Sequence, residues 1–158
     1  MDRYLKLKLP GGKFLNVSVS RSRTMSAIRG KHTRSTEQTL RMALTRAGIK
    51  GWRTQAVNLP GKPDLYFPAQ KLAVFVDGCF WHFCPRCGHI PATRRPFWRA
   101  KIERNRTRDK QVKASLGKLG IRTLRIWEHE LRHKCKVGRA IQKITRKLNS
   151  GLVTRTKG

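Results

Sequence analysis

Apolar positions recur along the chain with two periods, one typical of an α-helix and one typical of a β-strand. Leu40, Leu44 and Ala47 are spaced as on one helix face and Gly48 follows them, so TEQTLRMALTRAG is predicted to be a helix. Three short strand candidates come next, separated by the turn-forming sequences LPGKP and PAQ. They are WRTQAV (52–57), DLYF (64–67) and KLAVFVD (71–77), in an order that resembles a meander.

The second half of the chain alternates helix and strand. A long helix is expected from about Pro96 to Leu119, because Pro suits a first helical turn. Its apolar face is predicted to consist of Trp98, Ile102, Val112, Leu116 and Leu119. IRTLRIW (121–127) is predicted to be a further strand, and VGRAIQKITRKLN (137–149) a closing amphipathic helix. Strands enclosed by helices predict an α/β domain with a mixed central sheet.

The charge balance of the chain points to a polyanionic partner. Its 158 residues include 37 Lys plus Arg against 8 Asp plus Glu, a net charge of +29, and self-repulsion on this scale opposes folding. Nucleic acid is the commonest such partner, although a basic soluble surface or an RNA-coating protein would share the charge. The sequence has no apolar run long enough to span a membrane and no signal peptide, so we expect a cytoplasmic protein with reduced cysteines.

Acidic residues are rare in this chain, and two of them flank the strand candidates. Asp64 opens the strand LYF, and Asp77 closes the strand LAVFV. In an antiparallel hairpin the start of one strand lies beside the end of the next, so the two carboxylates are expected to be close. Close carboxylates suit a hard divalent cation such as Mg²⁺, which is used to cut phosphodiesters. The alternative is that both residues only form turns.

Two further acids lie on predicted helices. Asp109 falls in the middle of the apolar face of the long helix, with Asn105 beside it. A buried charge needs a partner, either a buried Arg or a catalytic His or metal, and we favour the second. Glu37 lies in the first turn of its helix, where the helix dipole alone would account for a negative charge.

The segment FVDGCFWHFCPRC combines metal ligands with aromatic side chains. Cys79, Cys84 and Cys87 suit a tetrahedral Zn²⁺ site, although they could also be reduced cysteines packed under a loop. The fourth-ligand candidates are His89, His129, His133 and Cys135, of which His129 is favoured by its position after a strand.

The same segment holds a possible acid–base group and exposed rings. His82 could transfer a proton during hydrolysis, or else be a zinc ligand or a surface ring. Phe80 and Trp81 lie in a Gly-Cys loop, where large rings can stack on or between bases. Trp98 could equally belong to the core.

These residues together resemble the very short patch repair (Vsr) DNA mismatch endonucleases. The blocks RSRTMSAIRGKHT, LPGKPDLYF, VFVDGCFWH, PATRRPFW, KIERNRTRD and IRTLRIWEHEL follow the family's order, from about Arg21 to Leu131. The resemblance implies a restriction-endonuclease-like fold of the PD-(D/E)xK type with a structural zinc site. It implies a Mg²⁺-dependent single-strand nick beside a T:G mismatch, which arises when 5-methylcytosine deaminates.

The resemblance also implies roles for individual residues. Asp64 corresponds to the metal-binding Asp and is joined by the main chain near Val76, while His82 is the catalytic His, Asp109 its supporting acid and Glu37 an active-site Glu. The zinc ligands map to Cys79, Cys84, Cys87 and His129. Residues expected to contact DNA are Met25, Ile28, Phe80, Trp81, Trp98 and Asn105. The best-known form of the motif has His at the position of Asp77, so this acid is expected either to bind metal or to act as a base.

The expected organisation follows from these matches. Residues 1–20 form a basic N-terminal extension, 21–150 the endonuclease domain with a DNA-binding arm at 21–34, and 151–158 a basic tail. We expect a monomer associated with the bacterial nucleoid, with mismatch-repair proteins as candidate partners. The alternatives are a nuclease of the same fold with a restriction, phage or mobile-element target, and a non-catalytic zinc-bearing nucleic-acid-binding protein.

Overall fold

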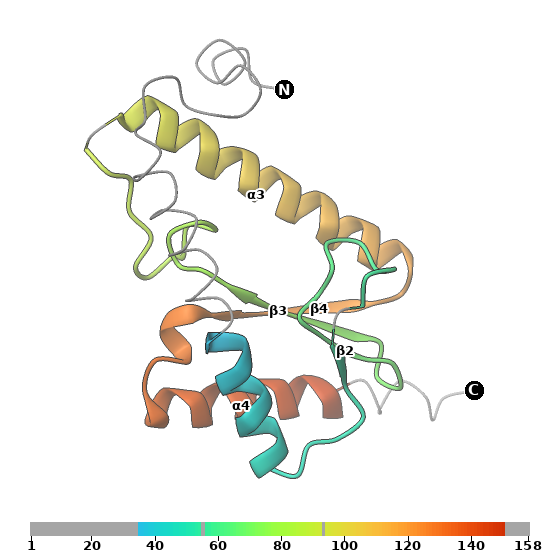
Figure 1. Cartoon of the computed structure of the whole chain (residues 1–158). Helices are drawn as coiled ribbons and strands as arrows, with labels where there is room; N and C mark the ends of the chain where they lie inside the picture. The colour runs from blue at the N-terminus through green and yellow to red at the C-terminus, as the bar shows by residue number, and fades with distance from the viewer. Residues whose placement is uncertain (1–34, 55, 93, 151–158) are drawn as a thin grey trace.

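A four-stranded mixed sheet lies at the centre of the molecule, with helices on both of its faces (Figure 1). The structure, a computed structural model, describes residues 35–54, 56–92 and 94–150. The strands are β1 (Arg53–Thr54), β2 (Leu65–Phe67), β3 (Leu72–Asp77) and β4 (Arg122–Trp127). The helices are residues 35–46, α3 (Arg95–Lys118), the 3-10 helix η2 (Glu128–Glu130) and α4 (Lys134–Asn149).

The strands lie in the order β1-β2-β3-β4. The first three form the predicted antiparallel meander, whereas β4 pairs with β3 in parallel. Parallel neighbours need a long crossover, and this connection consists of the Cys-rich loop and α3. The mixed sheet between helices confirms the predicted α/β class.

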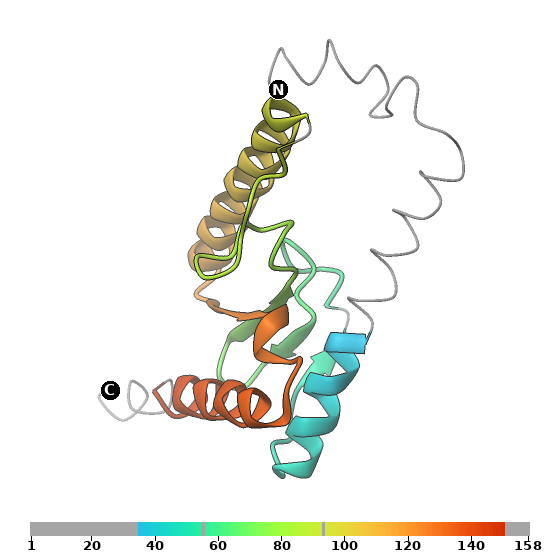
Figure 2. The same ribbon diagram turned by 90° about the vertical axis from the view of Figure 1, so that its left-hand side faces the viewer.

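Strand β3 is buried along its whole length because both faces of the sheet are covered. Leu72, Val74 and Val76 pack against the helix of residues 35–46 and α4, which lie together below the sheet in Figures 1 and 2. Ala73 and Phe75 pack on the other face, beneath α3. Side chains alternate along a strand, so Asp77 at the end of β3 lies on the α3 face as well.

Three boundaries and one core position differ from the prediction. Strand β1 is only two residues long, and α4 begins at Lys134, before the predicted Val137. Leu119 is 54% exposed, because it lies beyond α3 where Gly120, with φ of 67°, turns the chain into β4. At the other end of α3 the fully packed ring is Phe97, while Trp98 is only partly buried.

The loop before β2 packs tightly against α3. Gly61 has φ of 75°, and a Cβ atom added there would collide with the side chain of Val112 and approach Phe75 at 3.3 Å. Only a residue without a side chain allows this close approach. The contact fixes the loop that carries Lys62 and leads to Asp64.

Some of the predicted parts lie outside the described residues. These are the extension 1–20, the arm 21–34 with Met25 and Ile28, and the tail 151–158. Among the helices that the structure describes, none is long and apolar enough to cross a membrane.

Candidate active site and metal centre

A cavity of about 380 Å³ lies between the sheet, α3 and the loops before β2 and after β3. Seven ionisable side chains line it: Asp64, Asp77, Asp109, His82, Lys62, Arg108 and Arg125. The antiparallel pairing of β2 with β3 brings Asp64 and Asp77 to this cavity, as the hairpin geometry predicted. The loop after β3 contributes the His, and α3 contributes the third Asp.

Asp64 lies among negative charges. Its Oδ2 accepts a 2.6 Å hydrogen bond from the backbone N–H of Val76. Burial raises the pKa of Asp64 to about 7, against the opposing effect of this hydrogen bond, and the charges of Glu37 and Asp77 raise it further. Glu37 also shares a hydrogen bond with Asp64, and this bond raises the pKa of Asp64 as well. A cation beside Asp64 would offset these negative charges and favour its ionised form.

A second group of charges joins β3, β4, α3 and the Cys-rich loop. His82 Nδ1 lies 2.7 Å from Asp109 Oδ2 and 3.9 Å from Asp77 Oδ1. Arg125 Nη1 lies 2.9 Å from the same Asp109 oxygen. Asp109 therefore has both a His and an Arg as partners, although the Arg125 side chain is partly exposed and not buried as the first alternative expected.

The ionisation of Asp109 decides where the proton on His82 lies. Burial raises the pKa of Asp109, but hydrogen bonds from Arg125 and His82 outweigh it, and the pKa is lowered. A carboxylate only accepts hydrogen bonds, so Nδ1 of His82 must carry the proton. In the neutral ring Nε2 then keeps its lone pair. Asp77 differs, because burial raises its pKa against the charges of His82 and Arg125.

A separate cluster of three Cys and one His lies at the end of the β3–β4 pair. The ligand atoms of Cys79, Cys84, Cys87 and His129 all lie within 4.8 Å of one another. Nδ1 of His129 lies 3.2, 3.6 and 3.4 Å from the three sulfurs in that order. Tetrahedral Zn²⁺ sites place sulfur and nitrogen ligands about 3.5 Å apart, given their usual bond lengths. The cluster can therefore hold a metal ion.

The chemistry of these thiols also suits a cation. Burial raises the pKa of Cys79 to about 12, so this sulfur needs a positive charge to become a thiolate. At Cys84, burial is outweighed by hydrogen bonds from the backbone N–H groups of Arg86 and Cys87, and the pKa is lowered. Of the other candidate ligands, His89 lies against Phe80 instead, and His133 and Cys135 are exposed.

The Cys-rich loop is held at several points. Glu128 Oε2 accepts the backbone N–H of Cys79 at 3.3 Å, and its Oε1 pairs with Arg132 at 2.6 Å. Asn105 Nδ2 donates a 2.9 Å hydrogen bond to the carbonyl of Trp81. Asn105 therefore supports the loop, and its expected contact with DNA stays a prediction.

The loop and α3 together present a group of aromatic rings. Phe80 lies 5.1 Å from both Trp81 and Trp98, measured between ring centroids, and the two Trp rings lie 6.0 Å apart. All three side chains are partly buried, while Phe97, whose ring centroid lies 5.1 Å from that of Trp98, is buried. The rings expected to enter DNA thus form one cluster, and the buried Phe97 packs against its Trp98 member.

Sequence analysis missed the cations of the cavity and the brace at Glu128. The side chains of Lys62 and Arg108 make no hydrogen bond or ion pair with any residue that the structure describes. A signal for Arg125 exists, because a charge inside the apolar strand IRTLRIW requires an acidic partner. Its partner could not be read from the sequence, because the sequence does not state which strand lies beside it.

Comparison with known proteins gives a consistent result. The family model described as DNA mismatch endonuclease Vsr matches residues 16–87. The type II nicking enzyme V.NaeI of Lentzea aerocolonigenes is 43% identical over 118 residues, 72% of this chain and 70% of that protein. The DNA mismatch endonuclease Vsr of Escherichia coli is 38% identical over 120 residues, 75% of each chain. The type II nicking enzyme V.XorIIP of Xanthomonas oryzae is 41% identical over 109 residues, 68% of this chain and 78% of that protein.

The protein belongs to the Vsr family. The resemblance stated from its motifs is thereby confirmed, and the protein is a DNA endonuclease. The alternative of a non-catalytic binding protein is wrong. As a Vsr-family protein it acts on DNA, which accounts for its net charge of +29.

The pKa of Asp64 predicts an unusual effect of Asp64→Asn. Because the folded pKa, about 7, lies above the ordinary 3.8, ionisation opposes folding increasingly as the pH rises from about 4 to 7. In Mg²⁺-free buffer at pH 8 the variant should be more stable than wild type, by roughly 1–3 kcal/mol, and less so at pH 5. Urea unfolding measures this difference. Asp109→Asn is the opposite control, since the pKa of Asp109 is lowered and the variant should be less stable at pH 8.

Zinc analysis of two serine variants tests the metal cluster. Cys84→Ser removes one of the four gathered ligands and should lose the bound metal, with a fall in melting temperature. Cys135→Ser is the matched control, because Cys135 is an exposed free thiol outside the cluster. Elemental analysis should find about one zinc per chain in wild type and in the control. Zinc retained in full by Cys84→Ser would contradict the assignment.

Proposed function

We propose that this endonuclease makes a Mg²⁺-dependent single-strand nick beside a T:G mismatch and so starts very short patch repair. The observation that carries the proposal is the cavity, where paired acids and a His–Asp pair lie next to a cluster of three aromatic rings. The E. coli relative described as a mismatch endonuclease supports the target. The arrangement of Asp64 and Asp77 on a mixed sheet supports a restriction-endonuclease-like fold of the PD-(D/E)xK type.

Asp64 and Glu37 fit a divalent cation. Asp64 has a raised pKa and shares a hydrogen bond with Glu37, and both residues would supply carboxylate oxygens to the cation. The N–H of Val76 points at Asp64, and the N–H and C=O of a strand residue point to the same side, so the carbonyl of Val76 is a third oxygen donor. Mg²⁺ bound there would activate water and offset charge on the phosphate.

His82 is proposed to move the proton, with Asp109 holding it in place. The hydrogen bond at Nδ1 fixes the imidazole and leaves Nε2 for the reacting groups. Nε2 can take a proton from the attacking water or give one to the leaving oxygen. The side chains of four residues would hold a structural Zn²⁺, namely Cys79, Cys84, Cys87 and His129. The bound Zn²⁺ would keep the loop that carries His82 in position.

The aromatic cluster is proposed to test base pairing. Phe80, Trp81 and Trp98 would wedge into the duplex, where a mismatch lowers the cost of unstacking, usually a few kcal/mol per step. One chain supplies the metal ligands, the His–Asp pair and the rings, which supports action as a monomer.

A second candidate function is a nick at another target. Two relatives with 43% and 41% identity are described as type II nicking enzymes, against 38% for the mismatch endonuclease. The same cavity chemistry would serve both functions. The difference would lie in what the rings and the arm recognise.

A nicking assay separates these functions. Zinc-loaded protein would be mixed with duplexes that carry T:G, matched C:G or A:C at one site, with and without added Mg²⁺. We expect Mg²⁺-dependent nicking of T:G at least about 100-fold faster than of C:G, and loss of about 100-fold or more in Asp64→Asn. Equal rates on C:G and T:G would refute mismatch repair and leave the second candidate. Full activity of Asp64→Asn would show that the proposed metal site is wrong.

Lys62 is predicted to bind a phosphate near the cut. It lines the cavity and has φ of 50°, in the loop that Gly61 holds against α3. Lys62→Met should raise the KM for DNA about 5- to 20-fold and flatten its dependence on salt by about one unit of slope.

Lys71→Met is the matched control for Lys62→Met. Lys71 has φ of 47°, and its backbone N–H bonds a carbonyl three residues back, as that of Lys62 does. Lys71 is exposed and does not line the cavity. Equal effects of the two substitutions would mean that only general positive charge matters.

A further inference from the structure

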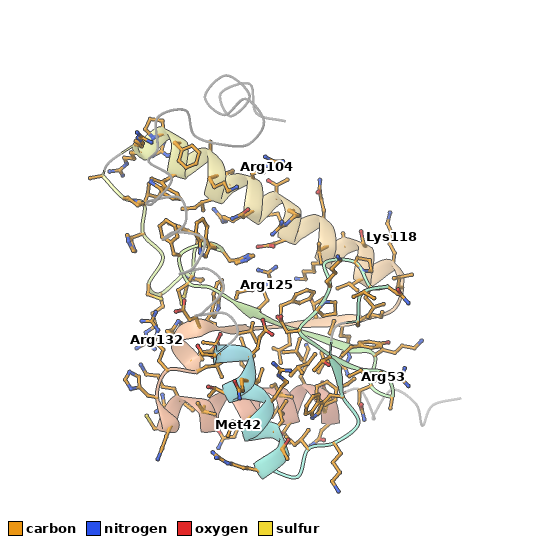
Figure 3. The ribbon with its side chains drawn as sticks, viewed as in Figure 1. Met42, Arg53, Arg104, Lys118, Arg125 and Arg132 are labelled. Carbon is orange, nitrogen blue, oxygen red and sulfur yellow. The ribbon has the colours of Figure 1, made fainter. Side chains whose placement is uncertain are left out.

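Arg125 of β4 bridges two acids from different parts of the fold. Its Nη1 lies 2.8 Å from Asp77 Oδ2, at the end of β3, and 2.9 Å from Asp109 Oδ2, on α3. Figure 3 shows Arg125 between α3 and the sheet, whereas Arg104 lies on α3 itself. The guanidinium lies 5.9 Å from the ring centroid of Phe75, its neighbour in the parallel register. A single nitrogen therefore connects three elements around the cavity.

Asp77 depends on this cation. It is 5% exposed, and among the described residues its Oδ2 has no hydrogen-bond donor in good alignment. The Arg125 nitrogen at 2.8 Å thus compensates this oxygen through charge, while the same nitrogen donates a hydrogen bond to Asp109. An unpaired carboxylate in such a place would be costly.

The same pairing makes Asp77 unsuitable for Mg²⁺. Magnesium binds carboxylate oxygens at about 2.1 Å, so an ion on Oδ2 would lie within about 5 Å of the guanidinium nitrogen. The two cations would repel at that distance. Asp64 has no such cation paired with it among the described residues, and acids surround it instead.

Asp109 connects Arg125 to the proposed chemistry. One oxygen of Asp109, Oδ2, accepts hydrogen bonds from both Arg125 Nη1 and His82 Nδ1. Arg125 therefore fixes the position of the atom that orients the imidazole. Its effect on His82 would be exerted through Asp109.

We propose that Arg125 is a positioning residue for His82, and that Asp77 is the buried anchor of Arg125 and not a magnesium ligand. The part of this proposal that concerns nicking rates rests on the proposed function. It assigns the acid at position 77 to the positioning of the acid–base group, which separates its role from that of Asp64.

Steady-state nicking of Arg125→Met tests the positioning role. The kcat should fall about 30-fold or more while the KM for DNA stays within about threefold, and Arg125→Lys should recover part of the kcat. Arg122→Met is the control, since Arg122 lies on the same strand but bonds Lys147 O and Gln70 O away from the cavity. A raised KM with reduced salt dependence and unchanged kcat would show instead that Arg125 binds DNA phosphate, and would overturn the proposal.

Magnesium titration of the nicking rate tests the role of Asp77. In Asp77→Asn the Mg²⁺ concentration for half-maximal rate should stay within about twofold of wild type, while in Asp64→Asn it should rise about 10-fold or more. A comparable rise in both variants would make Asp77 a metal ligand and refute the assignment.

A double-mutant cycle of unfolding tests the Asp77–Arg125 pair without DNA or Mg²⁺. Arg125→Met leaves Asp77 buried without its cation, so the double variant Asp77→Asn/Arg125→Met should have a higher urea midpoint than Arg125→Met alone. Strictly additive effects would refute the anchor. If the cycle shows coupling but no duplex is nicked, the proposed function fails and the structural pairing stands.

Discussion

The parallel pairing of β3 with β4 determines where the chemical groups of this protein lie. Asp77 lies opposite Trp127, so Cys79 and His129, each two residues further along, leave the sheet side by side. The same register places Arg125 next to Phe75, on the face that carries Asp77. The carboxyl ends of parallel strands commonly hold the ligand sites of α/β sheets. Here one pair of strands leads into the Cys–His cluster and also contributes Phe75, Val76, Asp77 and Arg125 to the cavity.

Acids are scarce in this chain, and most of those described face inward. Asp64, Asp77 and Asp109 line the cavity, Glu128 braces the Cys-rich loop, and Glu130 accepts the N–H of Trp127 and pairs with Lys143. Positive charge dominates the exposed side of α3 and α4, where a polyanion can be bound. The fold thus separates an electropositive exterior from a small interior group of negative charges. With this separation of charge, the exterior can attract DNA while Asp64 in the cavity remains a candidate ligand for a cation.

Local pattern predicted much of the fold and part of the site. The helix of residues 35–46 and α4 have a clear helical periodicity, α3 has a weak one and was predicted with the help of Pro96 at its start, and the proximity of Asp64 and Asp77 follows from hairpin geometry. The fourth ligand of the Cys cluster and the partners of Arg125 depend on the β3–β4 pairing. That pairing joins segments separated by the whole of α3, so periodicity does not encode it. Leu119 was misplaced because the helix pattern continues past the residue where the chain turns.

The hydrogen bonds from α3 to the Cys-rich loop connect the positions of two neighbouring loop residues. Asn105 holds the carbonyl of Trp81 and Asp109 holds the imidazole of His82, from positions one helical turn apart. Two adjacent residues of the loop, Trp81 and His82, are thus both hydrogen-bonded to the same helix, α3. A displacement of the Trp81 backbone would therefore act on the same helix that orients the His82 imidazole, which would couple the proposed test of base pairing to the proposed proton transfer.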